Sequence, residues 1–311
     1  MLPEKRDAVL IFNPRAGRAR GAHSGPLERA RKILAGHGIA SELAPTTEPG
    51  AAADLARQAV RDRRQMVIVC GGDGTLNEAV NGLAGSPVPL ALLPAGTANV
   101  LAKELGLPWN IERAAALVAG SVLRRIALGL VTTEGTADTG RYFISVAGAG
   151  PDGAMVQAVS SALKQRTGTL AYWAEGFRQL ALYSFPRFRV TTDDRTFEAT
   201  LVVIGRTKHY GGPFRITTEA SLYGNDFEFM ICTTRSRWKY LGYVPMLWAG
   251  QLRRARDAHF LRTTTVHCEP LDAIPAWMQV DGEPAGRLPA KFRIVPNALT
   301  LAVPKAPSRR K

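Results

Sequence analysis

One stretch, residues 67–78, constrains the fold of this chain more than any other. It begins with Val67-Ile68-Val69-Cys70, an unbroken apolar run of the kind found in strands that are buried on both faces of a parallel sheet. Glycines then interrupt the run, and apolar residues resume at helical spacing from Leu76 onward. The stretch therefore predicts a strand, a glycine-rich turn and a helix.

The predicted turn, Gly71-Gly72-Asp73-Gly74-Thr75, combines glycines with an acid. Glycines let the backbone approach a phosphate closely, and the following helix N-terminus offers free amide donors and the positive end of its dipole. A carboxylate among phosphates is explained if Mg²⁺ lies between them or if the carboxylate handles a proton. Asp73 is therefore a candidate for metal or proton chemistry, and the alternative is an ordinary tight turn between strand and helix.

Short apolar strands alternate with helices through the first 122 residues. Strands are expected at 8–12, 39–43 and 88–93, and helices at 24–38, 51–64 and 111–119. This alternation predicts an open α/β sheet, whose ligands bind beyond the carboxyl ends of the strands. The polar loops expected there include the one that begins at Asn13 and contains Arg18 and Arg20, and the one at residues 94–99.

The pattern changes near residue 122, where strand-like segments joined by Gly, Asp and Pro turns predict a mostly antiparallel, β-sandwich-like domain over residues 123–296. Strands are expected at 124–131, 142–147, 187–192, 196–204, 227–233, 263–269 and 277–280. Helical interruptions are expected at 153–183 and 236–257. Residues 297–311 are expected to form a last strand at 299–303 and a basic tail, with a return to the first domain as one option.

Composition narrows the class of protein. With 46% hydrophobic and 21% charged residues, the chain is expected to bury cores rather than stay disordered. Its net charge of +14 favours an anionic partner such as nucleic acid, an anionic membrane surface or phosphorylated ligands. Three scattered cysteines indicate a reducing compartment, and no signal-peptide core or membrane-spanning run is present, so a cytoplasmic protein is expected.

Five motifs occur in order along the chain: Asn13-Pro14…Gly17, Gly71-Gly72-Asp73-Gly74-Thr75-Leu76-Asn77-Glu78, Pro94-Ala95-Gly96-Thr97-Ala98-Asn99, Gly148-Ala149-Gly150-Pro151-Asp152 and Asp281-Gly282-Glu283. Together they resemble the diacylglycerol kinase catalytic domain family, which includes bacterial lipid kinases and sphingosine kinases. The resemblance runs from about residue 8 to about residue 303. It implies an N-terminal domain related to NAD kinases and 6-phosphofructokinases, followed by a β-sandwich, with ATP bound between them.

The resemblance also implies roles for residues. A lipid hydroxyl such as that of diacylglycerol is phosphorylated in a Mg²⁺-dependent reaction, with Asp73 beside the phosphates and their Mg²⁺. Asp281 or Glu283 is implied as the base that accepts the proton of the hydroxyl, and Asp152 as part of the same acidic cluster and a metal ligand. The implied ATP contacts are Asn13, Thr46, Gly71, Gly72, Asp73, Gly74, Thr75, Leu76, Asn77, Gly96, Thr97 and Asn99.

Two positions depart from the family pattern. Val100 stands where many diacylglycerol kinases have Asp after the Gly-Thr-x-Asn motif. The loop that often binds a structural Mg²⁺ in the bacterial enzymes corresponds here to Leu222-Tyr223-Gly224-Asn225-Asp226-Phe227-Glu228, whose acids are fewer and shifted. Asp226 is the candidate ligand in that loop.

Each candidate residue also has a plainer explanation. Asp281-Gly282 is a typical hairpin turn, although continued strand alternation would place Asp281 and Glu283 on one face, where Asp281 is the preferred base. Asn99 is suited both to ligand contact and to capping a helix that begins near Val100. Residues 234–254 interleave basic residues with Trp and Tyr, which suits either peripheral contact with an anionic membrane or a helix with a solvated basic face.

The leading function is ATP-dependent phosphorylation of a lipid alcohol. The alternatives are an NAD kinase-like enzyme, which shares the Gly-Gly-Asp-Gly element, and a catalytically silent lipid- or membrane-binding protein. A nucleic-acid partner is not expected, because the basic residues are dispersed and no reading module is present. The sequence does not identify the lipid, and the oligomeric state is open, with a homodimer as one option.

Overall fold

The computed structural model describes residues 6–15, 25–134, 140–158, 182–211 and 214–305. The chain forms two compact units. The first unit comprises residues 1–128 and 296–311, and the second comprises residues 129–295. The predicted helix at 153–183 and the predicted loop cations Arg18 and Arg20 lie wholly or mostly outside the described residues.

The first unit is an α/β layer structure, as the sequence predicted. Its strands are β1 (Arg6–Phe12), β2 (Ile39–Pro45), β3 (Met66–Gly71) and β4 (Leu90–Pro94). They are parallel and ordered β2-β1-β3-β4, and the sheet is extended by the end of β18 (Ala290–Val303), which pairs with β4 in parallel. The helices are α1 (Gly25–Gly36), α2 (Ala51–Arg61), α3 (Asp73–Leu83), α4 (Val100–Glu104) and α5 (Ile111–Ala119).

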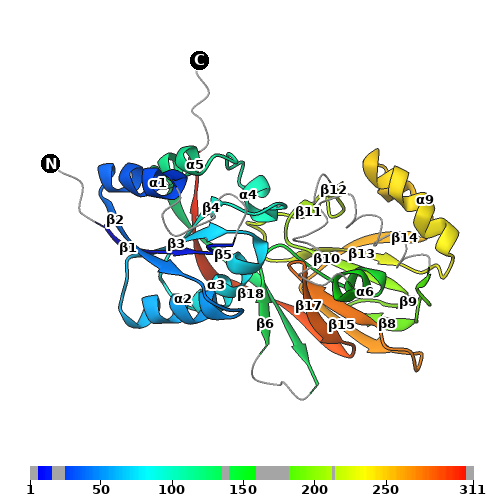
Figure 1. The fold of residues 1–311 in the computed structure, drawn as a ribbon. Coiled ribbons are helices and arrows are strands. Elements are labelled where there is room, and N and C mark those ends of the chain that lie inside the picture. Colours follow the sequence, from blue (N-terminus) through cyan, green and yellow to red (C-terminus); the bar gives the residue numbers. More distant parts are fainter. Residues whose placement is uncertain (1–5, 16–24, 135–139, 159–181, 212–213, 306–311) are drawn as a thin grey trace. The chain divides into compact units, whose positions relative to one another are not determined.

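Helices cover both faces of this sheet. Figure 1 shows α1 beside α5 on one face and α2 beside α3 on the other. On the first face, Leu10, Ile68 and Leu93 join side chains of α1 and α5 in one core cluster. The intervening strand residues, such as Val67 and Val69, are also fully buried. Burial on both faces explains why these strands read as unbroken apolar runs rather than alternating ones.

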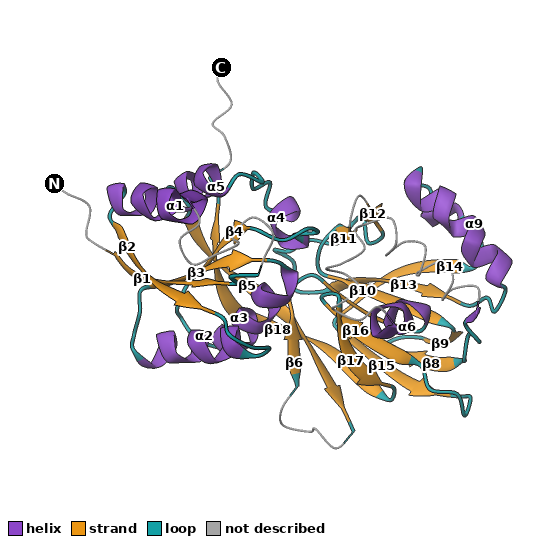
Figure 2. Ribbon diagram, viewed as in Figure 1, coloured by secondary structure: helices purple, strands orange, loops and turns teal. Residues whose placement is uncertain are grey.

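The second unit consists of antiparallel sheets, shown as orange strands in Figure 2. One sheet has the order β14-β13-β10-β7-β16-β17. Another contains β15, β8, β9 and the first part of β18, and β5 and β6 are attached to it. In addition, β11 pairs with β12 in a separate two-stranded sheet. The strands are β5 (Val122–Thr133), β6 (Arg141–Phe143), β7 (Val146–Ala149), β8 (Phe188–Thr191), β9 (Thr196–Ala199), β10 (Leu201–Gly205), β11 (His209–Gly211), β12 (Phe214–Arg215), β13 (Phe227–Cys232), β14 (Ala258–Thr263), β15 (Thr265–Pro270), β16 (Trp277–Val280) and β17 (Glu283–Arg287).

Aromatic rings form the core of the second unit. Phe143 stacks on Phe227 with ring centroids 5.6 Å apart, and Phe292 packs edge-on against Phe143 at 6.5 Å. Gly129 is required beside them, because a Cβ there would lie 2.2 Å from the Phe143 ring. The helical segments of this unit are α6 (Pro151–Ala158), α9 (Arg237–Trp248) and the short 3₁₀ helix η1 (Leu252–Arg254).

The sequence predicted the class of this unit correctly but merged two pairs of strands. The predicted strand 142–147 is divided into β6 and β7, and the predicted strand 196–204 is divided into β9 and β10. In both cases the two pieces belong to different sheets. The predicted helix 236–257 ends at Trp248, followed by a turn at Gly250 with a positive φ of 66°.

Candidate active site

The loops at the carboxyl ends of the parallel strands form the candidate site of the first unit. Asn13 N donates to Cys70 O at 3.3 Å, and Thr46 N donates to Phe12 O at 2.9 Å. Ala95 N donates to Gly71 O at 3.0 Å. These backbone hydrogen bonds join the ends of neighbouring strands, so the predicted nucleotide-binding loops lie at one edge of the sheet, where open α/β sheets bind their ligands.

Two glycine loops touch each other at this edge. A Cβ on Gly96 would lie 2.5 Å from the Gly72 Cα and 2.9 Å from the Asn99 side-chain oxygen. No side chain larger than hydrogen fits at Gly96 without moving the backbone. The glycines therefore keep the loops after β3 and β4 in backbone contact. Because neither glycine has a side chain, neither one covers the start of α3.

Asp73 is the first residue of α3, and its Oδ1 accepts a hydrogen bond from Val100 N at 2.7 Å. This carboxylate thus supplies the cap at the start of α4. Burial lowers the pKa of Lys103, and the negative charge of Asp73 opposes this shift without cancelling it. Asp73 is only partly buried, so it combines a positioned carboxylate with access from outside.

Asn99 has a different role from the predicted helix cap. It occupies the position before α4 in a left-handed conformation with φ 44°, but its side chain makes no cap hydrogen bond. Instead its Nδ2 donates to Gly96 O at 2.9 Å and its Oδ1 accepts from Gly96 N at 3.2 Å. The capping alternative for Asn99 is therefore not observed, because both polar atoms of its side chain bond to Gly96 and close the turn between these two residues.

The other predicted nucleotide contacts fall into two groups. Asn13, Thr46, Gly72 and Thr97 are at least partly exposed at the sheet edge, as are Gly74, Thr75 and Gly96. Leu76 and Asn77 are 3% and 1% exposed, respectively, because their side chains face the packed side of α3. Gly71 is likewise buried. The side chains of Leu76 and Asn77 are therefore not assigned to a nucleotide site.

The candidate residues of the second unit belong to a polar network within that unit. Asp152, in the first turn of α6, accepts hydrogen bonds from the Tyr210 hydroxyl and, at 2.8 Å, from Gln279 Nε2. Burial raises the pKa of Asp152 to about 7, while the Gln279 bond acts in the opposite direction. Gln279 Oε1 accepts from Gly282 N at 2.8 Å, so this one side chain joins Asp152 to the Asp281-Gly282 turn.

The Asp281-Gly282 pair is a hairpin turn between β16 and β17. Both residues have positive φ, 49° and 80°, as a type I′ turn requires, and Val280 pairs with Glu283 across the hairpin. The prediction that strand alternation continues through Asp281 was wrong, because the chain reverses there. Asp281 and Glu283 therefore do not share a strand face.

The Asp281 carboxylate holds the backbone between β6 and β7. Its oxygens accept hydrogen bonds from the amides of Ile144, Ser145 and Val146 at 3.0, 2.9 and 3.0 Å. Glu283, the first residue of β17, is half-buried, and its carboxylate has no hydrogen-bond or ion-pair partner among the residues that the structure describes. The two acids of the motif therefore differ: one is engaged by the backbone, and the other is available for chemistry.

Asp226 belongs to a separate part of the second unit. Its carboxylate forms a bidentate ion pair with Arg262, with N–O distances of 2.7 and 2.8 Å. The neighbouring carbonyls of Leu222, Gly224 and Asp226 accept hydrogen bonds from the fully buried Arg206 guanidinium at 2.8–2.9 Å. Arg206 and Arg262 thus both bring positive charge to this loop. The sequence reasoning missed Arg206 because nothing in its neighbourhood along the chain marks it.

Within the described residues, no group of three or more His, Cys, Asp or Glu side chains is placed to hold a metal ion. A Mg²⁺ ion held by one or two carboxylates together with substrate phosphates needs no such cluster. Asp73 fits that kind of site, since it is a hard oxygen donor at a glycine-rich helix start. Asp152 and Asp226 do not, because Tyr210 and Gln279 occupy the first and Arg262 occupies the second.

Comparison with known proteins matches two family models in sequence order. Residues 7–131 match the diacylglycerol kinase catalytic domain, and residues 145–303 match the YegS C-terminal NAD kinase beta sandwich-like domain. The chain is 29% identical over 303 residues to a diacylglycerol kinase of Bacillus subtilis, covering 96% of both chains. It is 27% identical over 298 residues to one of Staphylococcus saprophyticus, covering 93% of this chain and 92% of the relative.

Solved structures share the fold. A diacylglycerol kinase structure from Bacillus anthracis aligns with a TM-score of 0.76 at 21% identity, covering 96% of this chain and 97% of that chain. Another structure from the same organism aligns with a TM-score of 0.78 at 20% identity. The two matched domains together span nearly all of the described chain, and the predicted resemblance is confirmed. The chain belongs to the diacylglycerol kinase catalytic domain family, with a YegS-type C-terminal β-sandwich-like domain, and is a phosphotransferase of the lipid kinase type that acts on an alcohol group.

Proposed function

We propose that this lipid kinase transfers the γ-phosphate of ATP to the hydroxyl of a lipid alcohol, with diacylglycerol as the first candidate substrate. One observation carries the proposal: Asp73 stands at the start of α3, in a loop whose glycines are in backbone contact with the loop after β4. Phosphoryl transfer depends mainly on positioning and charge neutralisation, and this arrangement serves both. The relatives named above as diacylglycerol kinases support the choice of lipid.

In this proposal the phosphates of ATP lie against the amides that begin α3 and against the loops that contain Asn13 and Thr97. Asp73 would hold the Mg²⁺ ion, which when bound neutralises charge on the phosphates. Val100 N, through its bond to Asp73 Oδ1, fixes the orientation of the carboxylate. The lipid hydroxyl is a weak nucleophile at neutral pH, and a carboxylate that accepts its proton assists the attack.

We assign the role of base to Glu283 rather than Asp281. The Asp281 oxygens already accept three backbone hydrogen bonds, so protonating them would break contacts that hold residues 144–146. Glu283 has no such bonds within the described part of the chain. This choice reverses the preference drawn from the sequence, which depended on a strand continuing where the chain in fact turns.

The test is transfer of labelled phosphate from ATP to lipid, with Mg²⁺ present and product extracted into organic solvent. Diacylglycerol is expected to be labelled, and Asp73→Asn is expected to lower the rate by roughly a thousandfold or more. Asn retains an oxygen that can accept from Val100 N, so the fold should persist. Asp54→Asn is the matched control, since its carboxylate is 76% exposed in the same unit.

The same assay separates the alternative functions. Phosphorylation of NAD with no lipid product would replace the proposal with an NAD kinase-like activity. Binding of lipid without ATP turnover would indicate a catalytically silent protein. If folded Asp73→Asn keeps the turnover of the unmodified chain at saturating Mg²⁺, Asp73 only forms the turn and caps α4.

A further inference from the structure

The outer face of α9 is unusual for a helix in contact with water. Trp238, Leu241, Pro245 and Trp248 follow one another at spacings of three, four and three residues, which places them on one side of the helix. Trp238 is 76% exposed and Trp248 is 67% exposed. Between Lys239 and the end of the helix no residue is charged. Exposed helix faces are normally polar, so this face is suited to an apolar or interfacial partner.

The opposite side of α9 is firmly packed on the second unit. Tyr240 is buried, its ring stacks on Phe185 with centroids 4.5 Å apart, and its hydroxyl lies 2.9 Å from Thr200 Oγ1. Tyr243 and Leu247 pack against the same core cluster. The exposed face is therefore held in a fixed orientation, and it does not reach the surface through loose packing of the helix.

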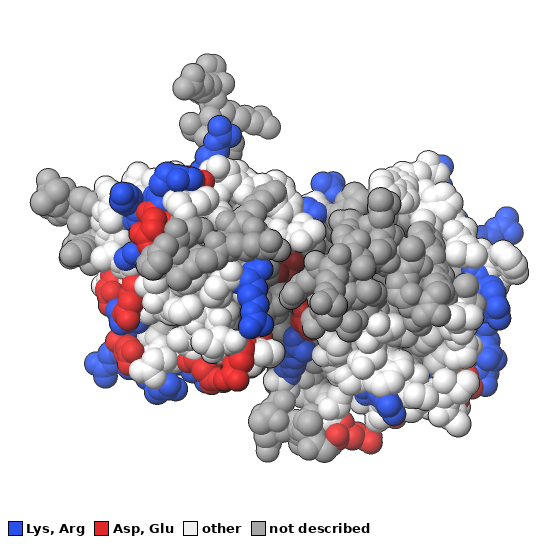
Figure 3. All heavy atoms as spheres, viewed as in Figure 1, with Lys and Arg blue, Asp and Glu red and all other residues white. Residues whose placement is uncertain are grey.

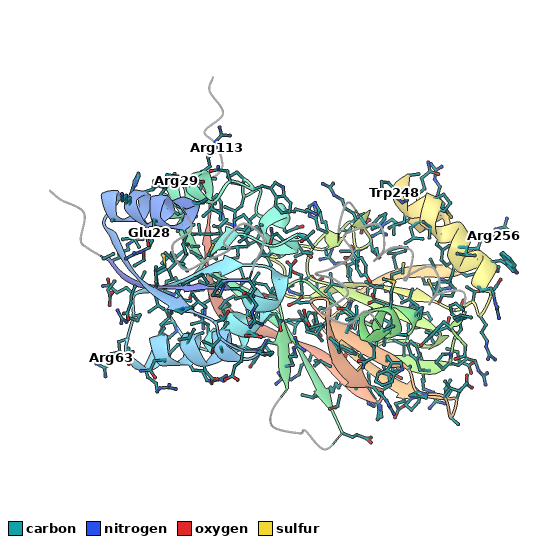
Figure 4. All side chains as sticks on the ribbon, in the orientation of Figure 1. Glu28, Arg29, Arg63, Arg113, Trp248 and Arg256 are labelled. Carbon is teal, nitrogen blue, oxygen red and sulfur yellow. The ribbon has the colours of Figure 1, made fainter. Side chains whose placement is uncertain are left out.

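The charge around α9 indicates what covers the exposed face. Residues 229–256 contain six cationic residues and no acidic one: Arg235, Arg237, Lys239, Arg253, Arg254 and Arg256. Figure 3 shows Lys and Arg side chains along the edge of the second unit that carries α9. In Figure 4, Trp248 on α9 and Arg256 in the segment after it both lie at the outer surface of this unit.

Some of these cations already have partners. Lys239 Nζ pairs with Asp257 at 2.7 Å, and Arg253 pairs with Glu219 and Glu228 and stacks on Phe260. Arg254 and Arg256 are exposed in the segment that follows α9, and Arg235, which precedes α9, is also exposed and acts electrostatically on Asp272. The pairing of Lys239 and Arg253 fixes their positions, while Arg254 and Arg256, which form no ion pair among the described residues, retain their charge for an external anion.

We propose that α9 is the element that docks this protein on anionic lipid bilayers, with the face containing Trp238, Leu241, Pro245 and Trp248 at the depth of the lipid headgroups. Tryptophan prefers this depth because its ring is apolar and its N–H finds polar partners, and arginines beside it pair with anionic headgroups. The inference rests on the proposed function in that the lipid substrate resides in the bilayer. It adds which surface makes the contact.

The test measures binding rather than activity. The chain is mixed with vesicles of phosphatidylcholine containing phosphatidylglycerol, and bound protein is measured by cosedimentation. Trp238→Ala, alone and with Trp248→Ala, is expected to weaken binding by roughly tenfold or more, because a large apolar ring no longer leaves water. Tyr223→Ala is the matched control, an exposed aromatic residue of the same unit outside α9, and should bind like the unmodified chain.

A second measurement locates the tryptophans. Phosphatidylcholine brominated in its acyl chains should quench the fluorescence of the unmodified chain on these vesicles, and Trp238→Phe with Trp248→Phe should remove most of that quenching. Unchanged binding in the Trp238→Ala variant, together with unchanged quenching in the Phe variant, would overturn the inference. A second outcome would also overturn it: the unmodified chain is a dimer, and Trp238→Ala converts it to a monomer without changing vesicle binding. A second copy of the chain would then be what covers this face.

The outcomes for docking and catalysis are separable. Trp238→Ala should phosphorylate a dissolved short-chain diacylglycerol at the rate of the unmodified chain, while its rate on long-chain diacylglycerol in vesicles falls with binding. A chain that binds anionic vesicles through α9 but phosphorylates no lipid would keep this inference and reject the proposed function. A chain that phosphorylates lipid but binds independently of α9 would do the reverse.

Discussion

Asp281 and Glu283 are separated by one glycine, but their surroundings predict opposite results on substitution. Glu283→Gln should lower turnover by roughly two to four orders of magnitude with the free energy of unfolding nearly unchanged, because the base acts only in the transition state. Asp281→Asn should lower the free energy of unfolding by roughly 1–3 kcal/mol, because three backbone amides lose part of their acceptor.

Single-turnover transfer, nucleotide affinity and urea unfolding distinguish these two roles. Both variants should bind ATP like the unmodified chain, since neither change alters the loops of the first unit. An active Glu283→Gln variant beside a fully folded but inactive Asp281→Asn variant would show that Asp281 is the base. Two active variants would leave the motif as a hairpin turn and place the base elsewhere.

Asp152 predicts a pH dependence of stability. Burial raises its pKa from 3.8 to about 7, so between those values the folded chain binds a proton that the unfolded chain has released. Raising the pH through this window therefore favours unfolding. Relative to Asp152→Asn, the unmodified chain should be more stable at pH 5 than at pH 8 by roughly 2 kcal/mol or more, with most of the change below about pH 7.

Urea unfolding of both chains at intervals from pH 5 to pH 8 measures this difference. Comparison with the Asn variant cancels other titrating groups, and Tyr210 can still donate to the Asn oxygen. Asp54→Asn, an exposed acid, should show no such trend. A stability difference that stays constant across this pH range would mean that Asp152 is already ionised at pH 5 in the folded chain.

At the scale of elements, the loop from Leu222 to Asp226 is held by one buried side chain. Arg206, at the end of β10, donates to carbonyls of this loop, and burial lowers its pKa to about 10, which leaves it charged at neutral pH. Arg206→Met should destabilise the chain by roughly 3–5 kcal/mol, because several buried carbonyls lose their donor. Arg262→Met, which removes a more exposed ion pair with Asp226, should cost about 1 kcal/mol.

Thermal unfolding with Mg²⁺ and with a chelator tests the same loop. Because a guanidinium already neutralises these oxygens, the unfolding temperature of the chain without nucleotide should be the same in both conditions. A marked loss of stability in the chelator, restored by Mg²⁺, would return the loop to the structural metal site considered from the sequence.

The elements that the sequence predicted well are those whose signal is local. Strands β1, β3 and β4 are buried on both faces, so each contains an apolar run that ends within two residues of a glycine or proline. Helix α5 was predicted with its observed ends. The fold class and the family followed from these elements and from the five motifs. The glycine contact between Gly72 and Gly96 follows from the same pattern, since both loops end neighbouring parallel strands.

The errors arise where a distant residue decides local structure. Ser145 and Thr200 lie in β-favouring sequence, yet each marks a point where the chain passes from one sheet to another. The first break is held by Asp281, 136 residues away, and Thr200 Oγ1 bonds to Thr234 O at 2.6 Å. No window of neighbouring residues contains those partners. The sequence-based preference for Asp281 as the base depended on the same hairpin, because it assumed a strand where the chain turns.

At the scale of the whole chain, the end of β18 supplies a strand that completes the sheet of the first unit. The first unit needs residues 296–303, although the second unit separates them from the rest of it in sequence. Leu301 pairs with Leu90 of β4, Gly85 N donates to Ala298 O at 2.8 Å, and Leu299 and Leu301 are fully buried. Without this segment, β4 would present an apolar edge to solvent, which is the kind of edge that promotes aggregation.

A fragment of residues 1–128 should therefore be less stable than a chain in which the same fragment is joined by a Gly/Ser linker to residues 296–305. Burial of Leu299 and Leu301 alone accounts for roughly 3–6 kcal/mol, a large part of the 5–15 kcal/mol that typically stabilises a domain. Urea unfolding followed by circular dichroism compares the two, and Leu301→Asp in the linked chain is the control that should behave like the short fragment. If residues 1–128 alone unfold at the same urea concentration as the linked chain, β18 is an addition to a unit that is already complete.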